Sequence, residues 1–341
     1  MSTSQEHADP PSVTGDELRD MAARWLEPGA VPKRCRIVTD TSDFFRVEYD
    51  DFVLLGGRPY LVRNYLREGR FGIDEQPKFW VRKIVDLADG SMKILKMTFR
   101  ERFTARVGSL TFEFIRSPVK EARILAMVRG HPRFMQGFGV KDAAGNTVRV
   151  IDYIKGASLA DHVPHLGSSH EEYFHLHFPG LLDEFIELVQ AIRFLHDRGQ
   201  KHADIRRDHV IAERTTGRCI WIDFDYNYWH KENMYGYDLF SLGNVLAFIA
   251  GRGDITTQQL RREQPAAFAR LTADDLNIVF NNRIATLKKV YPYIPDALDL
   301  VLRHFSTGAS VFYDDTAQLL ADLQEVRDTL TAPPSRKEPF P

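Results

Sequence analysis

The stretch from residue 201 to residue 225 limits the fold of this chain more than any other part of the sequence. It begins with a polar segment that contains Asp204, continues through two apolar runs, and ends in Asp223-Phe224-Asp225. Two short apolar runs after a polar loop predict a β-hairpin. The pattern therefore places Asp204 in the loop before the hairpin and Asp223 at the end of its second strand, where a carboxylate can hold a hard cation.

Composition and charge narrow the class of protein. The chain has 341 residues, of which 43% are hydrophobic and 27% charged, and its formal net charge is −2. These values fit one large two-lobed domain or two smaller ones, and near-neutral charge argues against a nucleic-acid partner. No apolar run reaches the ~18 residues of a membrane span. The first residues lack the pattern of a secretory signal, and two cysteines are too few for a disulfide framework. We therefore expect a cytoplasmic protein.

The first half of the chain has the pattern of a β-sheet. Apolar runs bounded by turn residues predict strands at 44–49, 52–55, 60–62, 79–85 and 92–97. Asp89-Gly90, between the last two, is a strong hairpin signal. We expect 44–55 to form an added hairpin and 104–114 to form a further insertion. A helix is predicted from Pro118 to about residue 128, because Ser117 can cap it and proline suits its first turn.

The second half has the pattern of helices. A predicted strand at 147–154 leads into it, and apolar residues then recur close to helical period at 181–196, 238–249, 297–305 and 316–330. A β-rich half with one main helix, followed by a helical half, predicts a two-lobed α+β fold. We expect a disordered tail at 1–17, an N-terminal extension with the added hairpin at 18–57, a β-rich lobe at 58–154, a helical lobe at 155–330 and a C-terminal tail at 331–341.

The loop and hairpin resemble those of the protein kinase superfamily, whose pattern is H-R-D-L-K-x-x-N followed by D-F-G. The residues that match the pattern are His202, Asp204, Asp223 and Phe224. The residues that depart from it are Arg206 at the lysine position, His209 at the asparagine position and Asp225 at the final glycine. The resemblance implies a bilobal protein-kinase-like fold and phosphoryl transfer from ATP.

The resemblance also implies a role for each residue of the loop. Asp204 would accept or orient the proton of an attacking hydroxyl, and Arg206 would neutralise charge on the transferring group. Asp223 would chelate Mg²⁺. His209 replaces the second metal ligand, and imidazole is a poor ligand for magnesium. Asp208 could supply the missing oxygen, and the alternatives are a single metal, Mn²⁺ or no chemistry.

Two further elements of the family have counterparts near the N-terminus. Lys96 ends a predicted strand and Glu121 lies one turn into the next helix, so the resemblance makes them the ion pair that positions phosphates. Without the family resemblance, Lys96 would be interpreted as a lysine at the edge of a strand and Glu121 as a solvated helix residue. Gly69, Phe71 and Gly72 resemble the tail of the glycine-rich nucleotide loop, although a plain β-turn explains them equally well.

Residues 150–159, which include the end of the predicted strand at 147–154, resemble the linker between kinase lobes. Adenine would pair with the backbones of Asp152 and Ile154, and Ile151 would close the rear of the pocket. The alternative is an ordinary transition from strand to loop.

The segment after Asp223 is short. Asp238 opens a predicted helix that resembles the one after the kinase activation segment, where it would support the catalytic loop together with His202 and Phe224. No serine or threonine lies in 224–237, so phosphorylation of a loop Ser or Thr cannot switch this protein.

The sequence thus predicts an ATP-dependent phosphotransferase that uses ATP and Mg²⁺ or Mn²⁺, with a protein Ser or Thr hydroxyl as acceptor by family resemblance. Two alternatives stay open. One is a kinase of small molecules or sugars, since such enzymes share the short segment. The other is a pseudokinase, a regulatory module that binds nucleotide without turnover.

Overall fold

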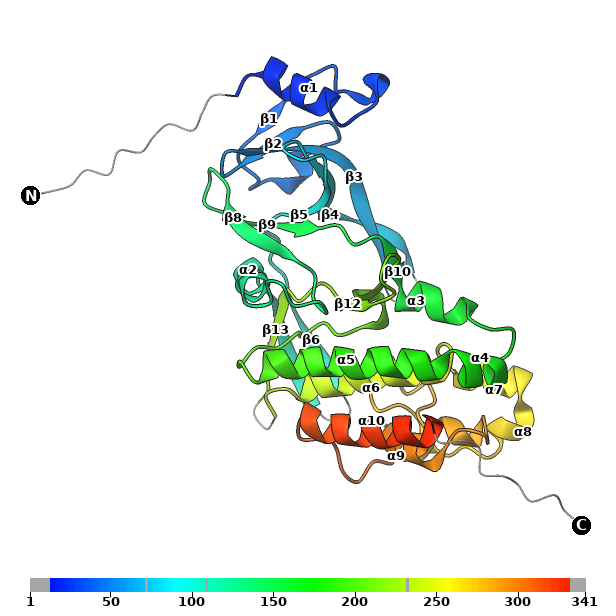
Figure 1. The fold of residues 1–341 in the computed structure, drawn as a ribbon. Helices are drawn as coiled ribbons and strands as arrows, with labels where there is room; N and C mark the ends of the chain where they lie inside the picture. The colour runs from blue at the N-terminus through cyan, green and yellow to red at the C-terminus, as the bar shows by residue number, and fades with distance from the viewer. Residues whose placement is uncertain (1–12, 71–72, 108–109, 231–232, 332–341) are drawn as a thin grey trace, which may run out of the picture. The chain divides into compact units, whose positions relative to one another are not determined.

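The computed structural model describes residues 13–70, 73–107, 110–230 and 233–331, and these form two compact units (Figure 1). The first unit holds the chain up to residue 100 together with 117–130 and 136–153, and the second holds 101–116, 131–135 and the chain from 154 onward. The first is rich in strands and the second in helices. The predicted α+β fold class is confirmed. The segment 104–114, predicted as an insertion before the helix, lies within residues 101–116, which belong to the second unit.

The first unit is built on a seven-stranded sheet with the order β1-β2-β3-β4-β5-β9-β8, counted over the described residues. Its strands are β1 (Ile37–Val38), β2 (Phe52–Leu55), β3 (Arg58–Arg70), β4 (Ile73–Asp86), β5 (Met92–Lys96), β8 (Gly137–Lys141) and β9 (Thr147–Asp152). β2 and β3 are joined through Gly56 and Gly57, whose φ angles of 55° and 77° suit the tight turns that favour glycine. The strand predicted at 79–85 lies within β4, and the strand predicted at 92–97 corresponds to β5, which ends one residue earlier.

Side chains of this sheet alternate between two cores, as a period of two requires. Tyr60 and Val62 of β3 belong to one buried cluster, while Leu61 between them belongs to the other. The second cluster is closed by α1 (Gly15–Ala23), whose Leu18 is buried there. The main helix of the unit is α2 (Pro118–Met127), which Ser117 caps as predicted, and which packs against β8 and β9.

Two expectations for the N-terminal region are wrong. Residues 15–17, predicted as part of a disordered tail, form the first turn of α1, because Thr14 and Glu17 make a capping box. The predicted hairpin at 44–55 does not form: Phe44–Arg46 is a short 3-10 helix, and β2 pairs in parallel with β1 and antiparallel with β3. Residues 1–12 and 332–341 lie outside the described residues.

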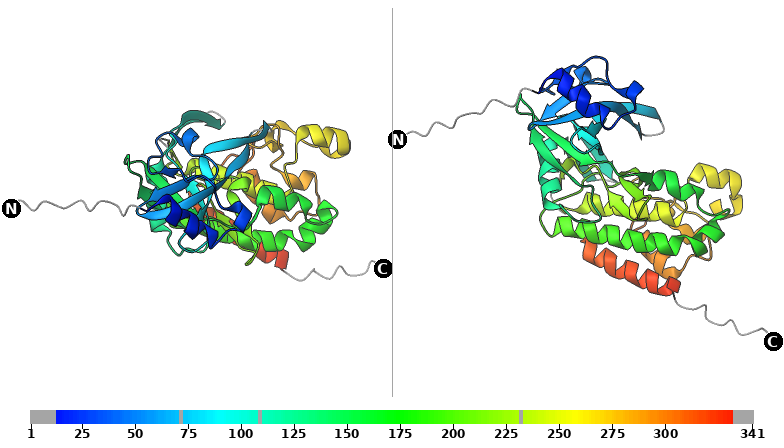
Figure 2. Two further views of the ribbon diagram at one scale, coloured as in Figure 1. Left: turned by 90° about the horizontal axis from the view of Figure 1, so that it is seen from above. Right: turned by 45° about the horizontal axis from the view of Figure 1, so that its top comes forward.

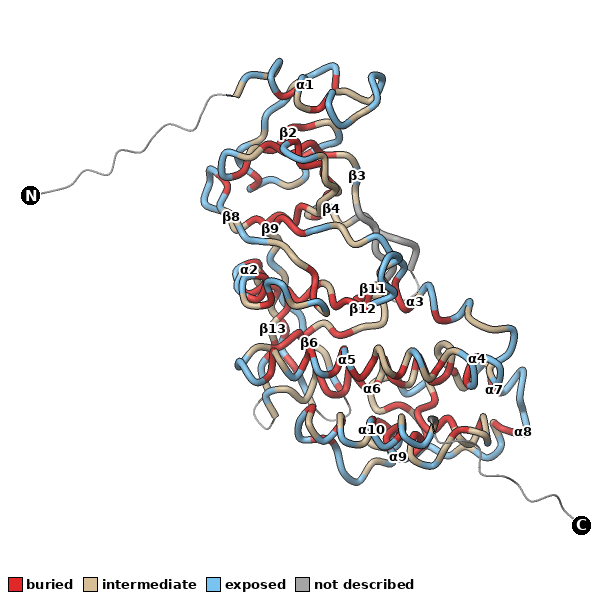
Figure 3. The backbone as a smooth tube through the Cα atoms, in the orientation of Figure 1, coloured by how far each residue is buried: buried red, intermediate tan, exposed pale blue. Residues whose placement is uncertain are grey.

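The second unit is mainly helical. Its helices are α3 (Leu159–His162), α4 (His170–Leu176), α5 (Phe178–His196), α6 (Gly236–Ala250), α7 (Thr257–Glu263), α8 (Pro265–Phe268), α9 (Asp296–Arg303) and α10 (Thr316–Thr331). α6 and α10 both pack against α5, as the views in Figures 1 and 2 show. Figure 3 shows most of α6 in red, and short red stretches that alternate with tan and blue along α5. Among the described helices none is both long and apolar enough to span a membrane.

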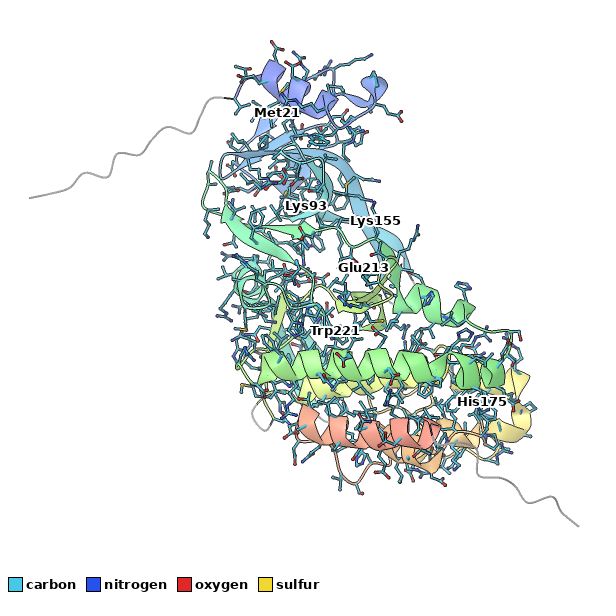
Figure 4. All side chains as sticks on the ribbon, viewed as in Figure 1. Met21, Lys93, Lys155, His175, Glu213 and Trp221 are labelled. Carbon is cyan, nitrogen blue, oxygen red and sulfur yellow. The ribbon has the colours of Figure 1, made fainter. Side chains whose placement is uncertain are left out.

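The second unit also contains two small sheets, whose strands flank Asp223 and include those of the segment 102–116. One has the order β10-β11-β12 and the other β13-β7-β6. Their strands are β6 (Arg102–Val107), β7 (Leu110–Arg116), β10 (Gly156–Ser158), β11 (Val210–Glu213), β12 (Cys219–Trp221) and β13 (Tyr226–Trp229). β11 and β12 form the predicted hairpin. Trp221, labelled in Figure 4, is fully buried and donates its indole N–H to the carbonyl oxygen of Leu188 in α5 at 3.0 Å, which ties the hairpin to the helical core.

Candidate functional site

The backbone of the loop that carries Asp204 is held by Asp238, in the first turn of α6. The fully buried carboxylate of Asp238 accepts the backbone N–H groups of His202 and Ala203, each at 2.9 Å, and lies 3.0 Å from Nε2 of His196. Ala203 has a φ of 70°, which is costly for a residue with a side chain. Burial opposes its charge, but the hydrogen bond from His196 and the bonds from the loop lower the pKa of Asp238 below its usual range. An ionised Asp238 therefore fixes the loop, which is the geometry its predicted supporting role requires.

Asp204 is a partly shielded carboxylate among other charges. Its side chain is 18% exposed, with Oδ1 3.6 Å from Nε of Arg206 and Oδ2 3.4 Å from Nδ1 of His209. Burial raises the pKa of Asp204, the electrostatic contacts of its carboxylate with the imidazole of His209 and with Arg206 act against that rise, and the charges of Asp223 and Asp225 add to it. A carboxylate with a raised pKa is a better proton acceptor near neutral pH.

His209 is buried and both of its ring nitrogens are engaged. Nδ1 lies 2.8 Å from the carbonyl oxygen of Asp204, and Nε2 lies 2.6 Å from Nη2 of Arg206. A guanidinium can only donate, so Nε2 accepts and the proton sits on Nδ1, an assignment that follows from the hydrogen-bond network. Nη2 of Arg206 also pairs with Oδ2 of Asp208 at 3.0 Å. His209 and Asp208, the two residues considered for a second metal, thus both contact Arg206.

Asp223 lies two residues after the end of β12, and its backbone has an unusual conformation. Its φ is 61°, and its backbone N–H faces the sulfur of Met135 at 3.5 Å. Phe224, which is fully buried, packs its ring against Phe134 and His202 with centroids 6.1 and 5.9 Å apart. The buried phenylalanine anchors the chain, so that the aspartate can hold a backbone conformation that side chains rarely adopt.

The donor set fits one magnesium ion better than two. The carboxylate of Asp223 is 11% exposed and is a hard oxygen donor of the kind Mg²⁺ prefers. Nε2 of His209 is 3.7 Å from Oδ2 of Asp223, but its lone pair is directed to Arg206. Asp223 is therefore the residue that would hold the ion, and the predicted participation of Asp208 and His209 stays a prediction.

Arg116 lies at the end of β7 and is buried, whereas its spacing from Lys120 and Arg123 suggests a solvated or phosphate-facing helix face. Its Nη1 pairs with Oδ2 of Asp225 at 2.9 Å, its Nε lies 3.4 Å from Oε2 of Glu101, and its guanidinium lies over the ring of Tyr226 at 4.3 Å. Burial works against its charge, but Asp225 and then Asp223 outweigh that effect and raise the pKa of Arg116. Asp225 in a buried run was the available signal for this pairing, because a buried carboxylate requires a cation nearby.

The predicted ion pair of Lys96 and Glu121 is present in the first unit. Nζ of Lys96 is 2.7 Å from Oε1 of Glu121, and the two side chains are 5% and 0% exposed, which excludes the solvated alternative. Oε2 of Glu121 is 2.8 Å from Nε of Arg149, which is fully buried and also donates to the carbonyl oxygens of Met97 and Thr147 at 3.1 and 3.0 Å. The sequence analysis missed Arg149, although an arginine within an apolar strand was a signal.

The nucleotide-loop prediction falls largely outside the described residues. Gly69 lies near the end of β3, whereas Phe71 and Gly72 are not described. Their contact with nucleotide stays a prediction.

The predicted linker residues lie at the end of β9 and just after it. Ile151 is buried, and the backbone N–H of Asp152 donates to the carbonyl oxygen of Gln136 at 2.8 Å while its side chain pairs with Lys93 at 2.6 Å. The carbonyl group of Asp152 is therefore the one that adenine pairing would use. Ile154 belongs to the second unit, and the adenine contacts of all three residues stay predictions.

No protein-family model matches the chain. The putative ribosomal protein S6 kinase alpha-2 of Caenorhabditis elegans is 27% identical over 116 residues, which cover 33% of this chain and 14% of that protein. The ovarian-specific serine/threonine-protein kinase Lok of Drosophila melanogaster is 22% identical over 156 residues, which cover 46% of this chain and 30% of that protein. The matched part thus spans less than a third of either relative.

A solved structure shares the fold. The kinase PK-1 of the Cydia pomonella granulovirus superposes with a TM-score of 0.50 at 13% identity, and the match covers 76% of this chain and 92% of that one. At this identity the similarity concerns the fold alone.

Proposed function

Because the chain belongs to the protein kinase superfamily, we propose that it is an ATP-dependent phosphotransferase that moves the terminal phosphoryl group of ATP to a hydroxyl group. The observation that carries the proposal is the state of Asp204. It is a carboxylate with a raised pKa, in a loop that Asp238 fixes, with Arg206 beside it.

In the proposed reaction Asp204 orients the acceptor hydroxyl and takes up its proton as the oxygen attacks. Its raised pKa supports this role, because a proton acceptor works best when its pKa approaches the working pH. Arg206 places a permanent positive charge next to that carboxylate, and its contacts with Asp208 and His209 set the position of the guanidinium. There it can offset negative charge on the transferring group.

Asp223 is the residue that would hold magnesium. A bound Mg²⁺ neutralises charge on the phosphates of ATP. Lys96 would contact the phosphates in the way its family counterpart does. Glu121 keeps Lys96 in place, and because Arg149 also pairs with Glu121, the three side chains together carry one positive charge. That charge favours an anionic ligand.

The acceptor we propose is a serine or threonine hydroxyl of a protein. Support comes from the relatives, one of which is named a serine/threonine-protein kinase. A small alcohol or a sugar is the alternative acceptor class, and the short segment between Asp223 and Asp238 favours it, because that segment leaves little chain for docking a peptide.

The test is transfer of labelled terminal phosphate from ATP, with Mg²⁺ and then with Mn²⁺, into the protein itself and into a cell extract. The products are separated into macromolecular and small-molecule fractions. Asp204→Ala is the catalytic control, and Asp197→Ala, which removes a carboxylate that is 61% exposed in the same unit, is the matched control. Label that Asp204→Ala abolishes and Asp197→Ala leaves unchanged supports the proposal, and the labelled fraction identifies the acceptor class.

One observation favours a second candidate, a pseudokinase that binds nucleotide without turnover. His209 stands where the family has a metal-binding amide, and its ring is held by Arg206 and by the backbone of Asp204. ATP binding without label transfer above the Asp204→Ala background, with both metals, would favour this candidate over the enzyme.

A further inference from the structure

The segment that follows Asp223 is part of a β-sheet with a hairpin from a distant part of the sequence. β13 pairs antiparallel with β7, with Tyr226 opposite Arg116 and Trp229 opposite Glu113, and β7 in turn pairs with β6. The β6–β7 hairpin precedes α2 in the sequence. In the described residues this pairing gives the segment a fixed backbone partner along its whole strand.

Aromatic side chains cover the same contact. The ring of Phe114 lies 5.6 Å from that of Tyr228 and 4.7 Å from that of Tyr237, and Phe112 lies 5.8 Å from Tyr228. Phe112, Phe114 and Tyr228 are all buried. Such pairs contribute beyond the apolar area that they bury, so the hairpin and the segment share one small core.

β13 is also tied to the loop that carries Asp204. Nζ of Lys201, the residue that opens this loop, donates to the carbonyl oxygen of Tyr228 at 2.7 Å and lies 4.3 Å from the centre of its ring. The strand therefore links the hairpin on one side with the candidate catalytic loop on the other.

An ion pair between Arg116, the last residue of β7, and Asp225, just before β13, joins the two strands at the end nearest Asp223. Both side chains are almost fully buried, with exposures of 2% and 0%. The kinase pattern has glycine at the position of Asp225, and glycine would leave the backbone there free to move. Asp225 removes that freedom, because its buried carboxylate is paired with Arg116 of β7.

We propose that Arg116 is a positioning residue for Asp223. Through its ion pair with Asp225 it holds the chain after Asp223 on the β6–β7 hairpin, and so keeps the metal-binding carboxylate in one orientation without any phosphorylation. The backbone of Asp223 needs such support, because its φ of 61° is unfavourable for a residue with a side chain. The catalytic consequence rests on the proposed function, whereas the structural consequence can be measured without turnover.

The test compares Arg116→Met with Arg106→Met, which changes an exposed arginine of the same hairpin. Two quantities are measured on the full chain. The first is amide hydrogen exchange of β13 by mass spectrometry. The second is the dissociation constant of Mn²⁺ in the presence of ATP, from the paramagnetic resonance signal of the free ion. We expect Arg116→Met to speed exchange in β13 and to weaken Mn²⁺ binding about tenfold, as the loss of one charge-assisted hydrogen bond implies. Arg106→Met should change neither.

A third comparison separates positioning from general stability. In an Asp225→Asn background the same arginine substitution should change Mn²⁺ binding far less, because the two effects act through one ion pair. If Arg116→Met does not fold, Arg116→Lys replaces it, since lysine keeps the charge but loses the planar fork, and we expect an intermediate shift.

Equal exchange and equal Mn²⁺ binding in the Arg116 and Arg106 variants would overturn the inference. So would faster exchange with unchanged Mn²⁺ binding, which would make Arg116 merely structural. Because neither measurement depends on phosphate transfer, a chain that transfers no label would refute the proposed activity and leave this inference to be decided by its own results.

Discussion

Replacing Arg149 by methionine should destabilise the first unit more than replacing Lys96, although Lys96 is the residue that the family pattern marks. Arg149 is fully buried and makes three hydrogen bonds: one to Glu121 and one each to the carbonyl oxygens of Met97 and Thr147. Methionine retains most of the apolar stem and none of the donors. The substitution therefore isolates the polar contribution of the guanidinium.

The magnitude follows from these bonds. Removing one partner of a buried ion pair costs about 3–5 kcal/mol, and the lower end applies here because Lys96 still pairs with Glu121. The carbonyl oxygen of Thr147 keeps a second donor, the hydroxyl of Thr98 at 3.0 Å. The bond to Met97 adds about 1 kcal/mol. We expect a loss of about 4 kcal/mol in the free energy of unfolding.

Lys96→Met leaves the bonds of Arg149 to Glu121 and to the two carbonyls in place. Its cost should therefore be about 3 kcal/mol, the same lower end for a buried ion pair, without the further loss of the bond to Met97. Urea unfolding of both variants measures the difference. The control is Arg129→Met, which changes an exposed arginine just after α2, the helix that carries Glu121. The reasoning is refuted if Arg149→Met costs no more than Arg129→Met, or if Lys96→Met costs more than Arg149→Met.

Three other outcomes are expected. The pKa of Asp238 is lowered, so its charged form contributes stability above the usual pKa of about 4, and that stability is lost as pH falls through the lower folded-state value. Asp238→Asn should therefore cost about 2 kcal/mol at pH 7, with a smaller difference in acid, as urea unfolding at a series of pH values would show; a constant difference contradicts this. Gly243→Ala should lower the melting temperature, because a Cβ there would lie 2.2 Å from the ring of Phe305, whereas Gly180→Ala, with nothing within 4 Å, should not. His209→Asn should lower the Mg²⁺ concentration for half-maximal phosphate transfer, because an amide oxygen suits magnesium better than imidazole does; an unchanged or higher requirement in a metal titration argues against it.

The parts of the site that lie within one local pattern were predictable. The loop with Asp204, the hairpin that ends before Asp223 and the helix with Asp238 each have a signature in neighbouring residues. The hairpin is found at its predicted position, and the helix begins two residues earlier than predicted, at Gly236. The pair of Lys96 and Glu121 followed from their order along the chain. The number of residues between Lys96 and Glu121 does not show how close their side chains lie in space. The prediction of the ion pair therefore depended on the family pattern rather than on physical chemistry.

The errors have physical causes. Residues 45–49 alternate between apolar and polar side chains as a strand does. However, the side chain of Asp43 accepts the backbone N–H of Phe45 and starts a 3-10 turn, a local hydrogen bond that competes with strand pairing. The capping box of Thr14 and Glu17 was a readable signal that was overlooked. The partner of the β6–β7 hairpin could not be predicted, because β-pairing between distant segments leaves no periodic trace in either one.

Two departures from the kinase pattern, at residues 225 and 209, differ in whether another residue must compensate for them. Asp225 adds a buried negative charge, and the guanidinium of Arg116 pairs with it, so the two residues depend on each other. Restoring glycine at 225 alone would remove the 2.9 Å ion pair of the buried Arg116 guanidinium and leave its 3.4 Å contact with Glu101, which should destabilise the chain. His209 is neutral in its hydrogen-bond network, so replacing it leaves no charge uncompensated. Reversion toward the family residue should therefore be tolerated at 209 alone, but at 225 only together with a change at 116.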